Sequence, residues 1–111
     1  VGLADRTCGP CKGGTPPLSR EEAEKLRSEV PRWTLSEAAD RLRREFRFKD
    51  FRRAMKFVDA VAEVAEEQGH HPDLHIHYNR VLVEIWTHKI GGLHENDFIL
   101  AAKIDRLAGA L

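Results

Sequence analysis

Histidine is concentrated in one stretch of this chain. Of the six histidines in the sequence, five lie between positions 70 and 88. Imidazole has an unperturbed pKa of about 6.5, so it can donate or accept a proton near neutral pH. The five are His70, His71, His75, His77 and His88. If the fold brings them together, they predict a site for general acid–base catalysis.

Two other interpretations of these histidines stay open. They could be surface residues on a solvated face of a sheet. Alternatively, His75 and His77 lie two positions apart on a predicted strand and so point the same way, as zinc ligands often do. Because no cysteine or carboxylate completes an obvious ligand set with these two, we expect no metal site.

A β-hairpin is expected to position the histidines. Aliphatic and polar residues alternate over positions 74–78 and again over 81–86, which is the period of half-buried strands. With Asn79-Arg80 as the turn, the aliphatic residues of both strands share one face. The predicted pairs are Tyr78 with Val81, Ile76 with Val83 and Leu74 with Ile85.

The opposite face of this hairpin would carry the chemistry. The predicted register places His71 opposite His88 and puts Trp86 on the same face. Pro72 has no N–H to donate to a ladder and is expected to end the pairing. Even so, His88 should lie close to the corner that His70 and His71 form. The hairpin therefore predicts that distant histidines meet.

Two carboxylates could assist the histidines. Glu66 lies one helical turn before His70, where it could hydrogen-bond a histidine or orient a substrate N–H group; a solvated glutamate is the alternative. Asp97 takes the third position of the last predicted helix, where helix capping alone would explain it.

Three helices are expected to support the hairpin. Ser19 and Glu22 form a capping box that begins the first helix. Apolar side chains at steps of three and four residues predict a second helix between Asp50, its N-cap, and Gly69, its C-terminal stop. A third helix follows an N-cap at His94. Its apolar stripe is wide enough to cover another subunit as well as the sheet.

A second hairpin is predicted from residues 33–35 and 41–48, the latter alternating apolar and charged side chains. Together these elements predict an α+β fold, in which an antiparallel sheet of two hairpins has three α-helices packed on one face. They form a single domain over residues 19–111, preceded by a flexible Gly/Pro-rich arm over residues 1–18.

Composition excludes several classes of function. The 18 basic and 18 acidic residues balance, so no net field attracts nucleic acid or anionic lipid. No apolar run approaches the ~20 residues that cross a bilayer, and the N-terminus lacks a signal-peptide pattern. We therefore expect a cytoplasmic protein that binds neither nucleic acid nor membrane.

The arm contains the pair Cys8 and Cys11, spaced as in half a zinc site or a thioredoxin-like redox motif. A redox pair needs a strand before it and a helix at its first cysteine, whereas glycines and prolines follow here. A structural zinc would need further ligands from elsewhere. We favour reduced thiols without a catalytic role.

The spacing of the candidate residues resembles the active-site pattern of the pterin-4a-carbinolamine dehydratase family. The pattern is an acidic residue, three residues, His-His-Pro, five residues, an aromatic residue, nine residues, His, eight residues and Asp. The matching residues here are Glu66, His70, His71, Pro72, Tyr78, His88 and Asp97, with Thr87 beside His88. The resemblance also covers Trp33 and the segments 46–51 and 91–93.

The resemblance implies dehydration of a 4a-hydroxytetrahydropterin to a quinonoid dihydropterin, without a metal or organic cofactor. It also implies homodimers or homotetramers, and a link to aromatic amino-acid hydroxylases, whose pterin cofactor the reaction recycles. Its catalytic residues would be His70, His71 and His88. Its substrate-binding residues would be Glu66, Trp33, Asp97, Pro72 and Thr87.

Some positions depart from the family's pattern. Gly69 stands where many relatives have an acidic residue, and His94 replaces the usual threonine or serine N-cap. His75 and His77 are not part of the pattern. Members of this fold also act as binding modules, as a dimerisation cofactor or an assembly factor, which is the alternative function.

Overall fold

A computed structural model describes residues 2–10 and 13–110 of the chain. These residues form a four-stranded sheet, three α-helices and two short 3-10 helices. In chain order the elements are η1 (Leu3–Asp5), α1 (Arg20–Arg27), β1 (Thr34–Leu35), β2 (Leu42–Arg47), α2 (Phe51–Gln68), β3 (Asp73–His77), β4 (Arg80–Ile85), η2 (His88–Ile90) and α3 (Glu95–Ala110).

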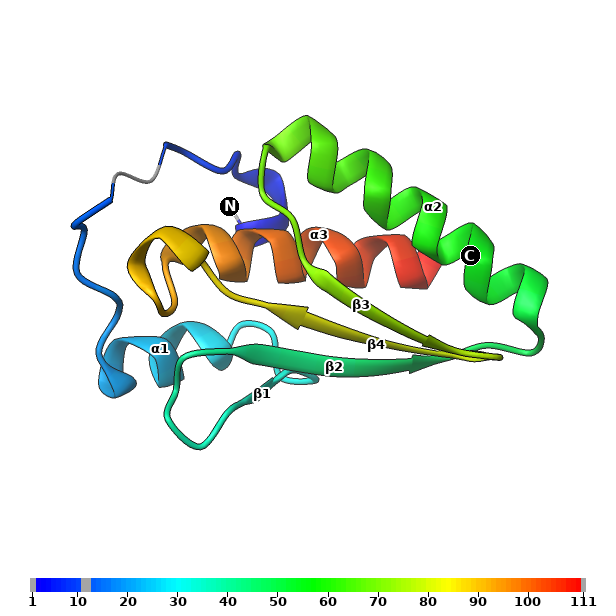
Figure 1. Cartoon of the computed structure of the whole chain (residues 1–111), viewed down its shortest axis with the longest axis horizontal. Helices are drawn as coiled ribbons and strands as arrows, with labels where there is room; N and C mark the ends of the chain where they lie inside the picture. Colours follow the sequence, from blue (N-terminus) through cyan, green and yellow to red (C-terminus); the bar gives the residue numbers. More distant parts are fainter. Residues whose placement is uncertain (1, 11–12, 111) are drawn as a thin grey trace.

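The sheet is built from two hairpins joined side by side. Its order is β1-β2-β4-β3 and all neighbouring strands are antiparallel, so β2 pairs with β4 at the centre (Figure 1). Residues from α1, α2 and α3 share one hydrophobic core with residues of the central strands. The predicted α+β fold, with two hairpins and three helices on one face, is confirmed.

Alternation along β2 and β4 separates the core from solvent. In β4, Val81, Val83 and Ile85 are fully buried, while the residues between them are partly exposed. Phe46 of β2 stacks at a tilt on Phe57 of α2, with ring centroids 4.6 Å apart. Burying such aliphatic and aromatic side chains is the main force that holds helices to the sheet.

The predicted helix ends are confirmed. Ser19 and Glu22 form a reciprocal capping box, and the Asp50 carboxylate accepts from the backbone N–H of Arg53 at 2.8 Å. Gly69 ends α2 in the left-handed region, with φ of 64°, which a residue without Cβ adopts readily. The chain therefore changes direction at Gly69, and His70 lies beyond the end of α2.

The register of the second hairpin differs from the prediction. Ile76 pairs with Val81 rather than with Val83, which shifts the whole ladder by two residues. The turn is therefore Tyr78-Asn79, not Asn79-Arg80. Since side chains alternate with a period of two, a shift of two keeps the aliphatic residues on the predicted face.

Contacts with the neighbouring strand account for this turn. The backbone carbonyl of Asn79 accepts from the N–H of Phe48 at 2.8 Å, and the Asn79 side chain donates to the Phe48 carbonyl at 3.0 Å. Tyr78 takes the positive φ of 52° that the turn requires. The choice of turn thus depends on Phe48, which directly follows β2 and lies outside the hairpin.

The described part of the arm is packed rather than free. Leu3 is only 3% exposed and belongs to the core cluster, and the Lys103 ammonium of α3 donates to the Ala4 carbonyl at 2.9 Å. Farther along, the Leu18 N–H donates to the Leu93 carbonyl. A buried leucine and helix α3 thus hold part of the arm, and its flexibility stays a prediction. The domain boundary at residue 19 stays a prediction.

Over residues 2–10 and 13–110, no helix combines the length and the hydropathy that crossing a bilayer requires.

Candidate functional site

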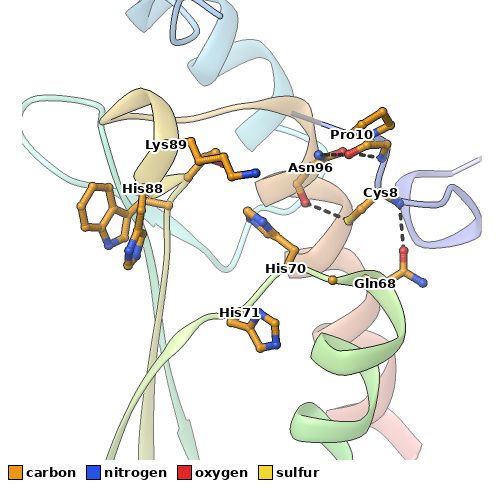
Figure 2. Close-up of a pocket in the computed structure, with 12 residues that line it drawn as sticks. Cys8, Pro10, Gln68, His70, His71, His88, Lys89 and Asn96 are labelled. Carbon is orange, nitrogen blue, oxygen red and sulfur yellow. Dashed lines mark hydrogen bonds between the residues drawn. The ribbon is translucent and has the colours of Figure 1, made fainter. Parts of the chain in front are cut away.

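The histidine segments meet at a pocket between the end of α2, the end of β4 and the start of α3. Its volume is about 490 Å³, within the range typical of small-molecule sites. The lining comes from residues 8–10, 68–71 and 86–89 and from Asn96 (Figure 2). Four separate stretches of the chain therefore build one site.

His70 is the most firmly held of the pocket histidines. Its Nε2 lies 2.5 Å from Oδ1 of Asp97, whose side chain is fully buried. The other oxygen, Oδ2, accepts from the Thr87 hydroxyl and from the His94 N–H, both at 2.8 Å. In neutral His70, Nε2 therefore carries the proton donated to Asp97, and Nδ1 is the proton acceptor.

The start of α3 explains why Asp97 is so well placed. His94 precedes the helix, and its ring Nδ1 accepts from the Asn96 N–H at 3.0 Å. In turn, the Asp97 carboxylate accepts a hydrogen bond from the His94 N–H, as in a capping box. The predicted N-cap at His94 is confirmed, and Asp97 both caps the helix and orients His70.

His71 lies on the outer rim of the pocket. Its Nε2 is 2.5 Å from the Glu66 carboxylate, and the two side chains are 61% and 76% exposed. Exposed pairs of this kind are worth about 0–1 kcal/mol, because water screens the charges. Glu66 therefore contacts a histidine, as the sequence suggested, although it does not line the pocket.

His88 is positioned by Trp86. The sequence analysis placed this tryptophan on the same face of the hairpin but gave it no function. The His88 ring stacks on Trp86, with centroids 4.0 Å apart and planes 29° from parallel. The Arg41 guanidinium lies over the same indole at 4.2 Å, and the indole N–H donates to the Asp73 carboxylate at 3.3 Å. Trp86 is thus fixed by both neighbours and fixes His88 in turn.

The remaining predicted residues differ in their distance from the pocket. Thr87 lines it and is buried. Pro72 connects His71 to β3 and is not part of the lining. Trp33 does not line this pocket: its indole lies in the core, edge-on to Phe46, and donates to Asp105 at 2.7 Å.

Sequence analysis left several other lining residues without a role at the site. They are Cys8, Gly9, Pro10, Gln68, Lys89 and Asn96. Gln68, Lys89 and Asn96 lie within two positions of His70, His88 and Asp97, so their closeness to the site was available from the sequence. Residues 8–10 reach the site only because the arm returns to α2 and α3, and no local pattern signals such a contact.

The pocket lining is basic and polar. It contains three histidines and Lys89, and none of its residues is acidic. The carboxylates of Asp97 and Glu66 bind histidines without lining the pocket themselves. Flat rings stack well on imidazole and indole, so the site suits a planar heterocycle with hydrogen-bonding edges.

Metal binding was the competing interpretation of the histidines. Among the described residues, no group of three His, Cys, Asp or Glu side chains is placed to hold a metal ion. His75 and His77, the pair considered as zinc ligands, lie on β3, and no third ligand accompanies them among the described residues. Cys11 lies outside the described residues, so the interpretations of the cysteine pair stay predictions.

Comparisons with known proteins point to one family. A family model described as "Pterin 4 alpha carbinolamine dehydratase" matches residues 16–107. A protein of Methylococcus capsulatus is 56% identical over 96% of this chain and 93% of its own length. One of Rubrobacter xylanophilus is 51% identical over 95% and 97%. Both are named "Putative pterin-4-alpha-carbinolamine dehydratase".

Two solved structures share the fold. A transcriptional coactivator/pterin dehydratase from Brucella melitensis is 33% identical, with a TM-score of 0.80 over 84% of this chain and 99% of that one. A pterin dehydratase-like protein, described as a RuBisCO assembly factor in the alpha-carboxysome, is 27% identical, with a TM-score of 0.61 over 69% and 89%.

Proposed function

Because this chain belongs to the pterin 4 alpha carbinolamine dehydratase family, we propose that it dehydrates a 4a-hydroxytetrahydropterin to the quinonoid dihydropterin. The observation that carries the proposal is that His70 and His88, from separate segments, line one pocket and are each held by a specific neighbour. The two imidazoles supply the acid and the base that the elimination needs.

The reaction breaks one C–O bond and moves two protons. The hydroxyl on C4a leaves as water after it receives a proton, N5 loses its proton, and the C4a–N5 bond becomes double. His70 is the better candidate for the base, because the Asp97 carboxylate at Nε2 stabilises the imidazolium that forms when Nδ1 accepts the N5 proton. His88 then donates the proton to the departing hydroxyl.

The rim residues would bind rather than react. His71, with Glu66 behind it, contributes a polar edge to the pocket mouth. Thr87, which is buried, acts through its hydrogen bond to Asp97.

In a cell this activity would recycle the pterin cofactor of an aromatic amino-acid hydroxylase in the cytoplasm, and the protein would act as a homodimer or homotetramer.

Substitution of the two pocket histidines tests the proposal. Histidine-to-alanine changes at His70 and at His88 should each lower kcat for a pterin carbinolamine by about 10²- to 10⁴-fold, the usual contribution of a positioned acid or base. His75→Ala is the matched control, because this exposed histidine lies on β3 and does not line the pocket. Unchanged turnover in both pocket variants would contradict the proposal.

A binding function is the alternative. The related chains described as a coactivator and as an assembly factor support it, since the fold serves partners there. The retained histidines favour the enzyme. Assay of the purified chain alone on a carbinolamine pterin separates the two, because a pure binding module would leave the spontaneous rate unchanged.

A further inference from the structure

The N-terminal arm supplies part of the pocket wall. Cys8, Gly9 and Pro10, here called the pocket strap, line the pocket beside Gln68 and Asn96. They precede residue 16, where the match to the family model begins. The strap therefore lies outside the residues that the family model matches.

Two side chains of the domain hold the strap by its backbone. The Asn96 side chain accepts from the Gly9 N–H at 3.0 Å and donates to the Gly9 carbonyl at 2.7 Å. The Gln68 side chain accepts from the Cys8 N–H at 2.8 Å. Asn96 is 4% exposed, so its bonds to Gly9 replace bonds to water and fix the strap in one position.

Contacts upstream of the strap reduce the loss of chain entropy when it docks. Leu3 is buried in the core, and the Arg106 guanidinium of α3 pairs with Asp5 at 3.0 Å. Because the chain just upstream of the strap is already attached to α3, less chain entropy is lost when Gly9 docks.

The strap presents a neutral surface to the pocket. The Gly9 amide and the Cys8 N–H are already paired, and the Cys8 thiol lies 3.6 Å from the Asn96 carbonyl. Burial raises the pKa of the Cys8 thiol to about 11, so it stays protonated near neutral pH. The strap therefore offers shape and apolar contact rather than charge.

The strap and His88 lie on opposite sides of His70. Figure 2 shows Cys8, Pro10, Gln68 and Asn96 to one side of the His70 ring and His88 to the other. A ring seated between His70 and His88 would direct any substituent that passes His70 towards the strap.

We propose that the pocket strap selects substrates by the substituent on the pterin ring, by contacting that substituent beyond His70. This rests on the proposed dehydratase function. The strap adds binding energy for a pterin whose substituent reaches it and none for a pterin with a small substituent.

Steady-state kinetics with two substrates test this selection. The substrates are the carbinolamines of 6-methyl- and of 6-(1,2-dihydroxypropyl)-tetrahydropterin. Asn96→Ala should raise KM for the dihydroxypropyl substrate about fivefold, as expected for one lost set of contacts worth ~1 kcal/mol. The methyl substrate should change less than about twofold in KM.

Arg53→Ala is the matched control, because it breaks an exposed ion pair with Asp50 at the end of α2 that lies away from the pocket. It should leave both KM values unchanged. If Asn96→Ala does not fold, Asn96→Asp takes its place, since aspartate still accepts from Gly9 but cannot donate to its carbonyl. Equal changes for both substrates, or none, would overturn the selection by the strap.

Alkylation of Cys8 gives a readout that is independent of turnover. In a Cys11→Ser background, iodoacetamide should modify Cys8 slowly, faster in Asn96→Ala, and more slowly when a saturating 6-(1,2-dihydroxypropyl)-7,8-dihydropterin is bound. An active enzyme whose Cys8 reacts equally fast with and without this ligand would refute the strap and leave the proposed function intact. An inactive enzyme with a ligand-protected Cys8 would refute the function and keep the strap.

Discussion

The two sides of the pocket are held in different ways. On the inner side, His70 is bonded to a fully buried carboxylate that accepts two further hydrogen bonds. On the outer side, His71 pairs with an exposed Glu66, and His88 is held by stacking on Trp86. A buried hydrogen-bonded group has one low-energy position, whereas an exposed ion pair has many. The inner side therefore holds its histidine in one orientation, whereas the exposed His71–Glu66 pair can adapt around a ligand.

The largest effect is expected from breaking the inner side at Asp97. Asp97→Asn places an amide N–H₂ where an acceptor is needed, so His70 must change tautomer or another donor loses its partner. The kcat for dehydration should fall by about 10²- to 10⁴-fold, as when a catalytic histidine is held in the wrong tautomer. Thermal unfolding should also occur at a lower temperature, because a buried polar group is left unpaired.

Thr87→Val is the graded control for that change. It removes one donor to Asp97 and keeps the contact with His70. Loss of one neutral hydrogen bond is worth ~0.5–1.5 kcal/mol, so kcat should fall by no more than about tenfold. Equal losses in the two variants would contradict the assignment of Asp97 as the residue that orients His70.

An intermediate effect is expected from the stack under His88. Trp86→Leu keeps an apolar side chain and removes the aromatic face, so the His88 ring gains rotational freedom. Aromatic pairs contribute ~0.5–1.5 kcal/mol beyond their area, which predicts a fall in kcat of about 2- to 12-fold. Arg41→Gln, which removes only the cation over the indole, should cost less. A larger loss from Arg41→Gln than from Trp86→Leu would contradict this order.

The smallest effect is expected at the rim. Glu66→Gln keeps the size of the side chain and removes the charge that faces His71. Because the pair is exposed and worth ~0–1 kcal/mol, KM should change less than about fivefold and kcat should stay the same. Titration of KM with salt checks the reason, since screening should reduce the difference from the unsubstituted protein. A fall in kcat like that of Asp97→Asn would show that the two sides do not differ.

Local patterns were sufficient for most of the fold. The caps at Ser19, Asp50 and His94 and the stop at Gly69 were predictable, because each depends on bonds within one helical turn. The aliphatic face of the second hairpin was predictable too, since it follows from a period of two. Its turn was not, because Asn79 is held by Phe48, which follows β2 outside the hairpin.

The candidate site divides in the same way. The sequence by itself indicated that His70, His71 and His88 lie near one another and that Asp97 lies at the start of a helix. Only the tertiary structure decided that Trp33 belongs to the core, that Trp86 stacks on His88 and that the arm lines one side of the pocket. The reason is physical. Helix caps and strand faces are fixed by neighbours a few residues away, whereas a pocket wall is fixed by packing between segments such as Gly9 and Asn96, whose contact no local pattern encodes.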